Sequence, residues 1–525
     1  MVANEAPSIA QTGTLQNYNA AVDLIEPNLA ARPDKIAYID EEGRYSFAEL
    51  AERVNRCANA FTGLGLSMEA RVMLCLTDSI DFPSAFLGAI KAGLVPVAVN
   101  TLLTSNDYDF MLRDSRAQVL IVSEPLLSVF KPILDDPPFL KDVVVSGGNS
   151  SGYPRLADLM AVAGSNCTVA PTRADDACFW LYSSGSTGQP KGTVHIQMSP
   201  IRTAELYGQP ILGIQESDVV FSAAKLFFAY GLGNALSFPL SVGATTVLLS
   251  ERPTPASVCR ILRQHRPTIF YGVPTLYSAL LASPELPKRE ELNLRRCTSA
   301  GEALPPDVGR RWLEHTGVDI LDGLGSTEML HIFLSNRHGD VRYGTSGKPV
   351  PGYDIRLVDE DGKPVAKGEI GELQVAGPTS AAFYWNNREK SRNTFIGPWT
   401  KSGDKYIESE DGYFTYCGRA DDMLKVSGIW VSPFEVEAAL ASHEAVLEAA
   451  VVGQGDDNGL IKPKAFVVLR TDAEQTPDLA AALQQHVKSR LAPYKYPRWI
   501  EFVPELPKTA TGKIQRFKLR AAGSP

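Results

Sequence analysis

The amino-acid sequence predicts an α/β protein with a large N-terminal domain and a smaller α+β C-terminal domain. At 525 residues the chain is too long for one hydrophobic core of about 100–200 residues. Over the first 400 residues, segments of helical length alternate with short runs rich in β-branched residues. This alternation is typical of parallel-sheet α/β subdomains. After about residue 347 the pattern changes, and after about residue 421 a further unit begins.

The strands expected in the first part are apolar runs at residues 71–76, 95–100, 118–122 and 245–249. The segments between them are long enough for helices, so we expect βαβ units with mainly parallel strands. Residues 226–250 carry no charge but include Gly, Pro, Asn and several hydroxyl side chains. A buried helix that ends before a core strand is therefore expected there, rather than a membrane-spanning helix.

A small β-barrel-like subdomain is expected to close the N-terminal domain, which we predict to span residues 1–420. Asp361-Gly362 and Asp411-Gly412 are hairpin turn signals. Residues 353–358 and 371–375 alternate in the way that antiparallel strands do.

The predicted C-terminal domain spans residues 421–525. Ser432, Pro433 and Glu435 form the pattern of a capping box at the start of a helix. Strands are expected at residues 446–452 and 464–469. One amphipathic helix is indicated by apolar residues that recur every four positions, namely Leu479, Leu483, Val487 and Leu491.

Charge and cysteine usage argue against several classes of function. The net charge is −9, whereas binding to DNA or RNA needs clustered Lys and Arg to neutralise phosphates. The seven cysteines form no CxxC pair and the seven histidines form no HExxH motif. We therefore expect reduced thiols, no structural zinc site and a cytoplasmic protein. The first residues lack the basic and apolar regions of a signal peptide, so no membrane association is expected.

The strongest functional signal is the string YSSGSTGQPKG at residues 182–192, directly after an apolar run. Its glycines allow backbone N–H groups to surround an anion, and its hydroxyls and lysine add donors and positive charge. The string is not a Walker A loop, because Pro190 and Gly192 replace residues that this motif requires. A flexible Ser/Gly linker is the alternative interpretation, but linkers rarely place Pro-Lys-Gly at the end of a core strand. The residues expected to bind phosphates are Ser183, Ser184, Gly185, Ser186, Thr187, Gly188 and Lys191.

This string resembles the signature loop of acyl- and aryl-CoA synthetases, the adenylate-forming superfamily. Further motifs of that superfamily follow in the same order over more than 300 residues. DGLGSTE at residues 322–328 resembles its second ATP motif, in which Thr327 would bond the α-phosphate and Glu328 would hold Mg²⁺. Leu324 departs from the pattern, because many relatives place an aromatic residue there against adenine. SAGEAL at residues 299–304 resembles the segment that lines the adenine and acyl pockets. These motifs add further expected nucleotide-binding residues, namely Gly301, Glu302, Asp322, Gly323 and Leu324.

The resemblance also implies a ribose site and a hinge. Asp404, in the string SGD, matches the position where a carboxylate accepts both ribose hydroxyls. In GRADDMLKVSG at residues 418–428, Arg419 would contact ribose and phosphate, and Asp421 would be the hinge of a mobile C-terminal domain. Lys425, Gly428 and Trp430 would line the path of coenzyme A.

The resemblance implies a two-step reaction with ATP, Mg²⁺ and coenzyme A. Lys513, in PKTATGK, resembles the catalytic lysine of the superfamily. A carboxylate would first attack the α-phosphorus of ATP, with Lys513, Thr327 and Glu328 as the catalytic residues. The thiol of coenzyme A would then attack the acyl-AMP after the C-terminal domain has moved. Acetylation of Lys513 would cancel the charge that the first step uses, so we retain it as a hypothesis for regulation.

Residues 222–234 and 328–336 resemble benzoate–CoA ligases in particular. Small residues would leave room for a flat ring, and larger side chains would close the far end of the pocket. Ordinary core packing is the alternative interpretation for Phe228 and His331. For the substrate, 4-hydroxybenzoate and 2-aminobenzoate are the nearest alternatives to benzoate, because one side chain can decide ring substitution. The expected pocket residues are Phe228, Ala229, Tyr230, Gly233, Ala300, Gly325, His331 and Ile332.

Two other classes of protein share parts of this pattern. A peptide-synthetase adenylation domain would have the same ATP motifs but feeds a carrier domain, and we expect none after Pro525. A non-catalytic AMP-sensing protein would not need Lys513, Glu328 and the complete phosphate loop together. We therefore expect an aryl-acid–CoA ligase that acts as a monomer or a homodimer.

Overall fold

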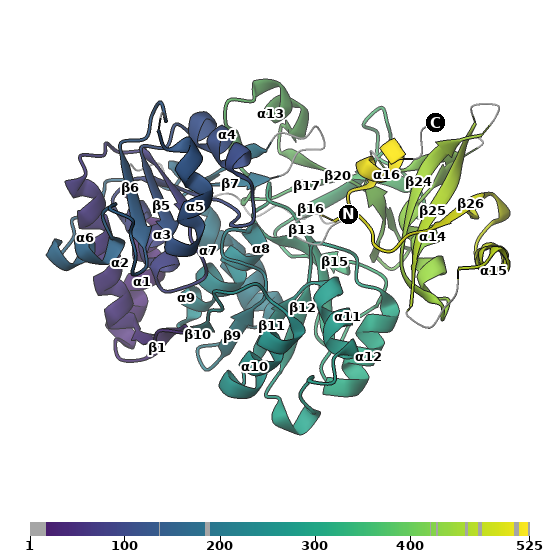
Figure 1. The fold of residues 1–525 in the computed structure, drawn as a ribbon, viewed down its shortest axis with the longest axis horizontal. Helices are drawn as coiled ribbons and strands as arrows, with labels where there is room; N and C mark the ends of the chain where they lie inside the picture. Colours follow the sequence, from purple (N-terminus) through teal and green to yellow (C-terminus); the bar gives the residue numbers. More distant parts are fainter. Residues whose placement is uncertain are drawn as a thin grey trace, which may run out of the picture.

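The structure is a computed structural model, and it describes residues 17–135, 137–183, 190–419, 422–426, 429–456, 460–470, 475–508 and 514–522. The strands within these ranges form sheets of nine, seven, five, three and two strands. Figure 1 shows the three-stranded sheet and its helices at one end of the molecule and the two largest sheets towards the other. The expected α/β class with a separate C-terminal domain is confirmed.

The nine-stranded sheet has six parallel strands at its centre and antiparallel strands at both edges. In spatial order it consists of β15 (Lys348–Pro349), β14 (Ile332–Ser335), β13 (Ile320–Gly325), β12 (Arg296–Ser299), β11 (Ile269–Gly272), β9 (Val219–Ser222), β10 (Thr245–Val247), β1 (Ile36–Ile39) and β2 (Arg44–Ser46). One core forms between this sheet and α10 (Pro255–His265), α11 (Pro274–Ala282) and α12 (Pro306–Thr316). Trp312 at its centre packs edge-on against Tyr277, with ring centroids 4.7 Å apart.

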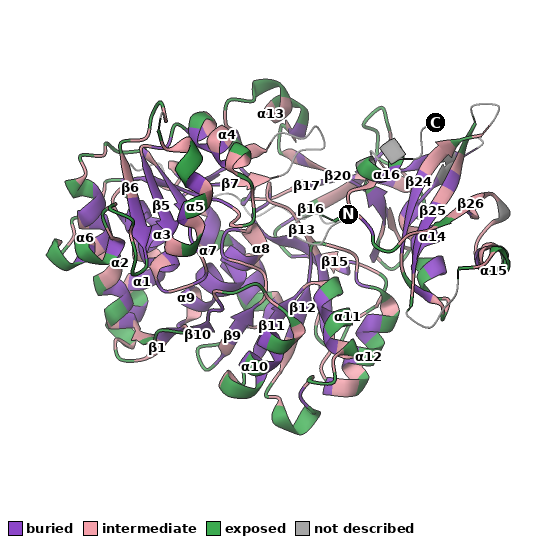
Figure 2. Cartoon of the chain, viewed as in Figure 1, coloured by how far each residue is buried: buried purple, intermediate pink, exposed green. Residues whose placement is uncertain are grey.

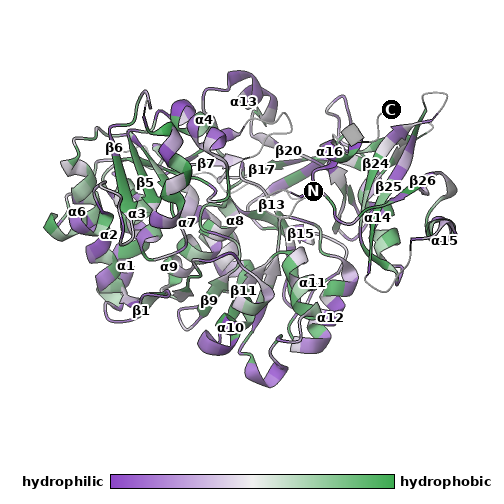
Figure 3. Ribbon diagram, in the orientation of Figure 1, coloured by the Kyte–Doolittle hydropathy of each residue, from purple (hydrophilic) through white to green (hydrophobic). Residues whose placement is uncertain are grey.

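The seven-stranded sheet is parallel from β7 to β6, and at the opposite edge β8 and then β18 are joined to it by antiparallel pairing. In spatial order it consists of β18 (Phe383–Tyr384), β8 (Lys191–Ile196), β7 (Ala177–Ser183), β4 (Val95–Ala98), β3 (Arg71–Cys75), β5 (Val119–Ser123) and β6 (Asp142–Ser146). Its helices are α1 (Ala20–Ala31), α2 (Phe47–Gly63), α3 (Asp81–Lys91), α4 (Ser105–Ser115), α5 (Leu127–Phe130) and α6 (Leu156–Val162). The strands are buried and apolar, as Figures 2 and 3 show for β5 and β6, because helices cover both faces of such a sheet.

The uncharged stretch forms a continuous helix between the two large sheets. It comprises α8 (Ala229–Leu232), the π-helical segment η4 (Gly233–Ser237) and α9 (Phe238–Val242), and β10 follows. A buried helix before a core strand is therefore confirmed. A second π-helical segment, η3 (Ala204–Leu212), continues α7 (Ser199–Thr203). Within the described ranges, every helix is too short or too polar to cross a membrane.

The third sheet is antiparallel and occupies the position expected for the barrel-like subdomain. It consists of β16 (Asp354–Val358), β17 (Ile370–Ala376), β20 (Trp399–Glu408), β19 (Phe395–Ile396) and β21 (Phe414–Arg419), with α13 (Arg388–Thr394) beside it. The Asp411-Gly412 turn joins β20 to β21, as predicted. The Asp361-Gly362 turn also reverses the chain as predicted, because backbone bonds join Asp359 to Lys363 and Leu357 to Val365 across it, and β17 itself begins at Ile370.

The C-terminal domain combines a hairpin and a three-stranded sheet. The elements are β22 (Leu424–Val426), β23 (Ile429–Val431), α14 (Pro433–Ala441), β24 (Val446–Gly455), β25 (Ile461–Leu469), α15 (Pro477–Lys488), β26 (Trp499–Phe502) and α16 (Arg516–Ala522). The capping box is only half formed. Ser432 Oγ accepts a bond from the Glu435 N–H at 3.1 Å, but the Glu435 carboxylate binds Lys495 Nζ at 2.6 Å instead of the helix start. Residues 420 and 421 lie outside the described residues, so the domain boundary stays a prediction.

Asp218, directly before the central strand β9, is a buried carboxylate with several hydrogen-bond partners. Its Oδ1 accepts bonds from Arg295 Nε and Thr268 Oγ1, both at 2.7 Å, and its Oδ2 accepts one from the Gln215 N–H at 2.7 Å. Asp218 is 2% exposed, so water cannot replace these bonds.

We therefore expect Asp218→Ala to lower the free energy of unfolding in urea by about 2 kcal/mol or more, because Arg295 and Thr268 lose their acceptor. Asp361→Ala is the control, because that carboxylate is exposed and should change stability by less than about 0.5 kcal/mol. Equal unfolding midpoints for both variants would contradict the assigned role of Asp218.

Candidate active site

Glu328 lies where the two large sheets meet, in the β13–β14 loop (residues 326–331). Tyr384 donates its O–H to Glu328 Oε1 at 2.6 Å, and Lys191 Nζ lies 3.7 Å from the same oxygen. Lys191 also lies 3.3 Å from the Tyr384 hydroxyl and 4.4 Å from the centre of its ring. Lys191 and Tyr384 come from the seven-stranded sheet, so this contact joins the two sheets.

Glu328 is ionised despite its burial. Burial raises the pKa of this carboxyl. The charge of Lys191 and the hydrogen bond from Tyr384 lower the pKa by more than burial raises it, so the resulting pKa lies below the usual value. Burial lowers the pKa of Lys191, and Glu328 opposes that change. Lys191 and Glu328 therefore stabilise each other's charged forms.

A single half-buried carboxylate is the kind of ligand that Mg²⁺ uses when nucleotide phosphates supply the other oxygens. No cluster of three or more His, Cys, Asp or Glu side chains suited to a metal occurs among the described residues. Glu328 thus fits a metal that arrives with a nucleotide, and it does not fit a metal enclosed by protein alone.

Asp404 and Arg419 form a second pair on the adjacent strands β20 and β21. Arg419 Nη1 lies 3.0 Å from Asp404 Oδ1, and the backbone register places the two residues opposite each other. Asp404 raises the pKa of Arg419. The charge of Arg419 contributes to lowering the pKa values of Glu328 and Lys191, so both charge pairs belong to one site.

At its other end the β13–β14 loop carries His331, which is 2% exposed and enclosed by aromatic rings. The ring centroids of Tyr207, Tyr230 and Phe238 lie 5.3, 5.5 and 4.5 Å from that of His331. His331 Nε2 donates to Asn234 Oδ1 at 3.1 Å, because this partner is an acceptor. Burial lowers the pKa of His331 to about 3, so the imidazole is neutral.

Glycines allow the helix and the strand to approach His331. A Cβ atom on Gly233 would lie 2.4 Å from His331 Cδ2, and one on Gly325 would lie 2.7 Å from the His331 carbonyl oxygen. Tyr230 is held by a 2.5 Å hydrogen bond between its hydroxyl and Thr298 Oγ1. The structure thus brings together Tyr230, Gly233, Gly325 and His331 of the predicted pocket.

The remaining pocket residues lie around this group. Ala300 and Ile332 are buried in the same core as Tyr230. Phe228 and Ala229 pack against the core of the seven-stranded sheet instead, at the border between the two cores. The Phe228 ring lies 4.5 Å from that of Phe227, so ordinary core packing accounts for part of its environment.

Among the expected nucleotide-binding residues, Ser183 ends β7 opposite Lys191. Gly301 has φ +93° and is exposed, with no atom within 4 Å of an added Cβ, and Glu302, which follows it, is half-buried. Gly323 and Leu324 lie on β13 and pair with β14. Burial raises the pKa of Asp322 on β13 to about 8.

Several predicted residues lie outside the described residues, namely Ser184, Gly185, Ser186, Thr187, Gly188, Asp421, Gly428 and Lys513. Lys425 and Trp430 are described only as backbone partners in the β22–β23 hairpin. Their roles stay predictions.

Tyr384, His195 and Asn234 are residues of the site that the sequence patterns did not reveal. Tyr384 lies about 200 residues after Lys191 in the sequence, and no motif connects the two. His195 Nε2 bonds the Thr327 carbonyl oxygen at 2.8 Å, and Asn234 contacts His331 through tertiary packing.

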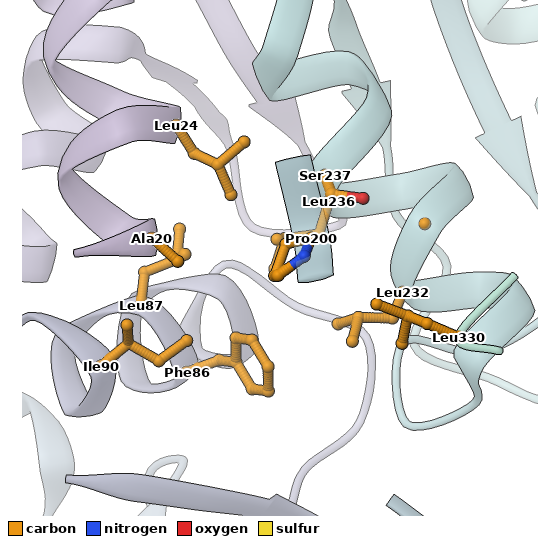
Figure 4. A pocket seen from close by; sticks show the side chains of 11 residues that line it. Ala20, Leu24, Phe86, Leu87, Ile90, Pro200, Leu232, Leu236, Ser237 and Leu330 are labelled. Carbon is orange, nitrogen blue, oxygen red and sulfur yellow. The ribbon is translucent and has the colours of Figure 1, made fainter. Parts of the chain in front are cut away.

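A small apolar cavity, shown in Figure 4, has Gly233 and Leu330 among its lining residues. Side chains of α1, α3 and the helix at residues 229–242 surround it, including Leu24, Phe86 and Leu232. It lacks charged groups, so it cannot bind a nucleotide, and it is a packing gap beside the site.

The known proteins that this chain resembles agree with this geometry. The AMP-binding enzyme family matches residues 25–385, and the AMP-binding enzyme C-terminal domain matches residues 435–513. A benzoate–CoA ligase of Thauera aromatica is 64% identical over 510 residues, which cover 97% of this chain and 96% of that protein.

Two solved structures are similar over almost the whole fold. A benzoate CoA ligase of Burkholderia xenovorans LB400 has 54% identity and a TM-score of 0.90, and the match covers 96% of this chain and 100% of that one. An anthranilate CoA ligase in complex with anthranoyl-AMP has 45% identity and a TM-score of 0.92, with 97% and 98% covered. This chain therefore belongs to the AMP-binding enzyme family of AMP-forming CoA ligases.

Proposed function

We propose that this chain is an ATP-dependent benzoate–CoA ligase, which forms benzoyl-AMP and pyrophosphate and then benzoyl-CoA and AMP. The observation that carries this proposal is the β13–β14 loop. It holds an ionised carboxylate, Glu328, only three residues from a neutral histidine, His331, inside a group of aromatic rings. A site for charged phosphates beside a site for a flat apolar ring suits an aryl acid and ATP. The benzoate ligases that match nearly the full length support the same substrate.

In the first half-reaction a carboxylate oxygen of benzoate attacks the α-phosphorus, and the bond from that phosphorus to pyrophosphate breaks. Attack of one anion on another requires positive charge and hydrogen-bond donors fixed in advance. Lys191 and Lys513 supply charge in this proposal, and Thr327 donates to the α-phosphate. Mg²⁺ held by Glu328 would neutralise phosphate charge. Asp404 would accept hydrogen bonds from the ribose hydroxyls, with Arg419 beside it.

In the second half-reaction the sulfur of coenzyme A attacks the acyl carbonyl carbon, AMP leaves, and the thiol proton passes to solvent. We assign Lys513 to the first arrangement only, because its charge is useful where pyrophosphate departs. The domain beyond residue 421 would turn between the steps and present Gly428, with Lys425 and Trp430, to the path of coenzyme A.

Reaction rates with three aryl acids distinguish this proposal from its alternatives. With ATP and coenzyme A, benzoate should give faster pyrophosphate release and acyl-CoA formation than 4-hydroxybenzoate or 2-aminobenzoate. His331 Nε2 is already bonded to Asn234 Oδ1, so a ring substituent that took this bond would have to displace Asn234. A preference for a substituted ring would reassign the substrate. Stable acyl transfer to a carrier protein without coenzyme A would reassign the acceptor.

Ala229 tests the ring pocket. Ala229→Leu should raise the apparent KM for benzoate by about tenfold or more and leave that for ATP nearly unchanged, because only the ring site loses volume. Steady-state kinetics with each substrate varied in turn provide the measurement. Ala481→Leu on the exposed face of α15 is the control for adding a large side chain. An equal rise in both constants for Ala229→Leu would show that the pocket is misplaced.

Lys513 and Gly428 test the separation of the two half-reactions. Lys513→Ala should slow adenylation by about 10²-fold, the scale for losing one preorganised stabilising group. It should still convert chemically prepared benzoyl-AMP and coenzyme A to benzoyl-CoA. Gly428→Leu should retain pyrophosphate release in a single turnover but form little thioester, because the side chain would block the path of coenzyme A. Parallel loss of both half-reactions in both variants would argue for one static site.

A further inference from the structure

We infer that Tyr384 and His195 are positioning residues, which hold the Thr327–Glu328 segment of the β13–β14 loop in the geometry that adenylation requires. The inference rests on the proposed function for the roles of Thr327 and Glu328. The β13–β14 loop belongs to the nine-stranded sheet, whereas Tyr384 and His195 belong to the seven-stranded sheet and hold the loop from there.

The backbone of the loop is bonded to the opposite side of the site at three consecutive residues. The carbonyl oxygens of residues 327, 328 and 329 accept bonds from His195 Nε2 at 2.8 Å, the Ala381 N–H at 2.7 Å and Thr379 Oγ1 at 2.8 Å. All three donors come from β8 or from the segment that leads into β18. The position of the loop therefore depends on the edge of the seven-stranded sheet.

The loop needs this support because its own backbone is strained. Leu330 has φ +65°, a left-handed conformation that a bulky side chain adopts at a cost of about 1–3 kcal/mol. Strain of this kind persists only where surrounding contacts define the conformation. The bonds at residues 327–329, immediately before Leu330, are such contacts.

Tyr384 fixes the side chain of Glu328. Its backbone pairs with Thr193 on β8, its ring lies 5.2 Å from that of Phe395, and it is 3% exposed. The hydroxyl therefore has little freedom, and it donates to Glu328 Oε1 at 2.6 Å. A hydrogen bond to one oxygen of a ligating carboxylate orients that ligand, and removal of such partners typically costs about 10–100-fold in metal affinity or activity.

His195 fixes the backbone of Thr327. It is fully buried, and its ring stacks on Phe179 with centroids 5.3 Å apart. The partner of Nε2 is a carbonyl oxygen, so Nε2 carries the proton, and Nδ1 has no hydrogen-bond partner among the described residues. A buried imidazole with one nitrogen unpaired is costly for stability, so Nε2 and its bond to Thr327 supply the polar contact of this ring.

The first test is Tyr384→Phe, which keeps the ring against Lys191 and Phe395 and removes only the hydroxyl. Mg²⁺ is titrated calorimetrically into the full chain saturated with a non-hydrolysable ATP analogue, and adenylation is measured in a single turnover. We expect Mg²⁺ binding and adenylation each to weaken by about 10–100-fold. The conversion of preformed benzoyl-AMP to benzoyl-CoA should stay within about twofold. Glu328→Gln provides the reference for loss of the ligand itself.

Tyr108→Phe is the matched control. It removes a buried tyrosine hydroxyl that donates one hydrogen bond, here to the Asn100 carbonyl oxygen at 2.7 Å, but Tyr108 lies on α4, in the core that α4 and α5 form with the seven-stranded sheet. It should leave Mg²⁺ binding and both half-reactions unchanged. If Tyr384→Phe behaved like Tyr108→Phe, the role assigned to Tyr384 would be wrong.

His195 is tested by rescue. His195→Leu should slow adenylation by about tenfold or more, whereas His195→Gln should recover most of the rate, because its amide N–H can reach the position of Nε2. Should His195→Leu not fold, His195→Gln is compared with His195→Met, which has a similar length and no donor. Equal rates for donor and non-donor variants would overturn the role assigned to His195. Failure of the wild-type chain to activate any aryl acid would instead overturn the proposed function.

Discussion

One half-buried, ionised carboxylate, Glu328, constrains the centre of this molecule. A charge inside a protein is tolerated only with a charged partner and hydrogen bonds, and Lys191 and Tyr384 supply these across the junction of two sheets. The edge strands β8 and β18 must therefore lie against the β13–β14 loop. The register of β18 on β8 places Tyr384 beside Thr193, two residues from Lys191, so the same backbone pairing positions both partners of Glu328.

The same loop changes from charged to apolar surroundings over three residues. At Glu328 the neighbours are a lysine, a tyrosine hydroxyl and the field of Arg419, whereas at His331 they are aromatic rings and the side chain of Asn234. Burial lowers the pKa of His331, so no second charge enters the ring site. Close packing of the helix at residues 229–242 on this histidine requires glycine at position 233. A phosphate site and a ring site can therefore lie side by side without sharing charge.

The C-terminal domain has its own buried charge network. Arg516 Nη2 binds both carboxylate oxygens of Glu437 at 2.8 and 2.7 Å, and Val451 donates its N–H to Glu437 Oε1 at 2.7 Å. Arg516 Nη1 also lies 3.7 Å from Asp422, at the start of the domain. These bonds join α16, α14 and β24, so the chain that follows the Lys513 segment is attached to the body of the domain.

Local sequence determined much of this protein. The hydroxyl- and glycine-rich string before Lys191, the DGLGSTE motif and the apolar runs of β3, β4 and β5 are contiguous, so their backbone preferences and residue types indicated the α/β class and Thr327, Glu328, Asp404 and Arg419 as candidate site residues. Turn and cap signals succeeded where the partner was local, as at Asp411-Gly412. They failed where a distant group competed, as at Glu435, whose carboxylate binds Lys495 rather than its own helix start.

Only the tertiary structure decided which side chains surround these motifs. Tyr384 reaches Glu328, His195 reaches Thr327 and Asn234 reaches His331 across separations of 56, 132 and 97 residues. No sequence pattern encodes such pairs, because each depends on the packing of two sheets and on the register of their edge strands. The identity of a residue in a motif is a local property, whereas the orientation of its side chain and its pKa depend on the charges and burial that the whole fold provides.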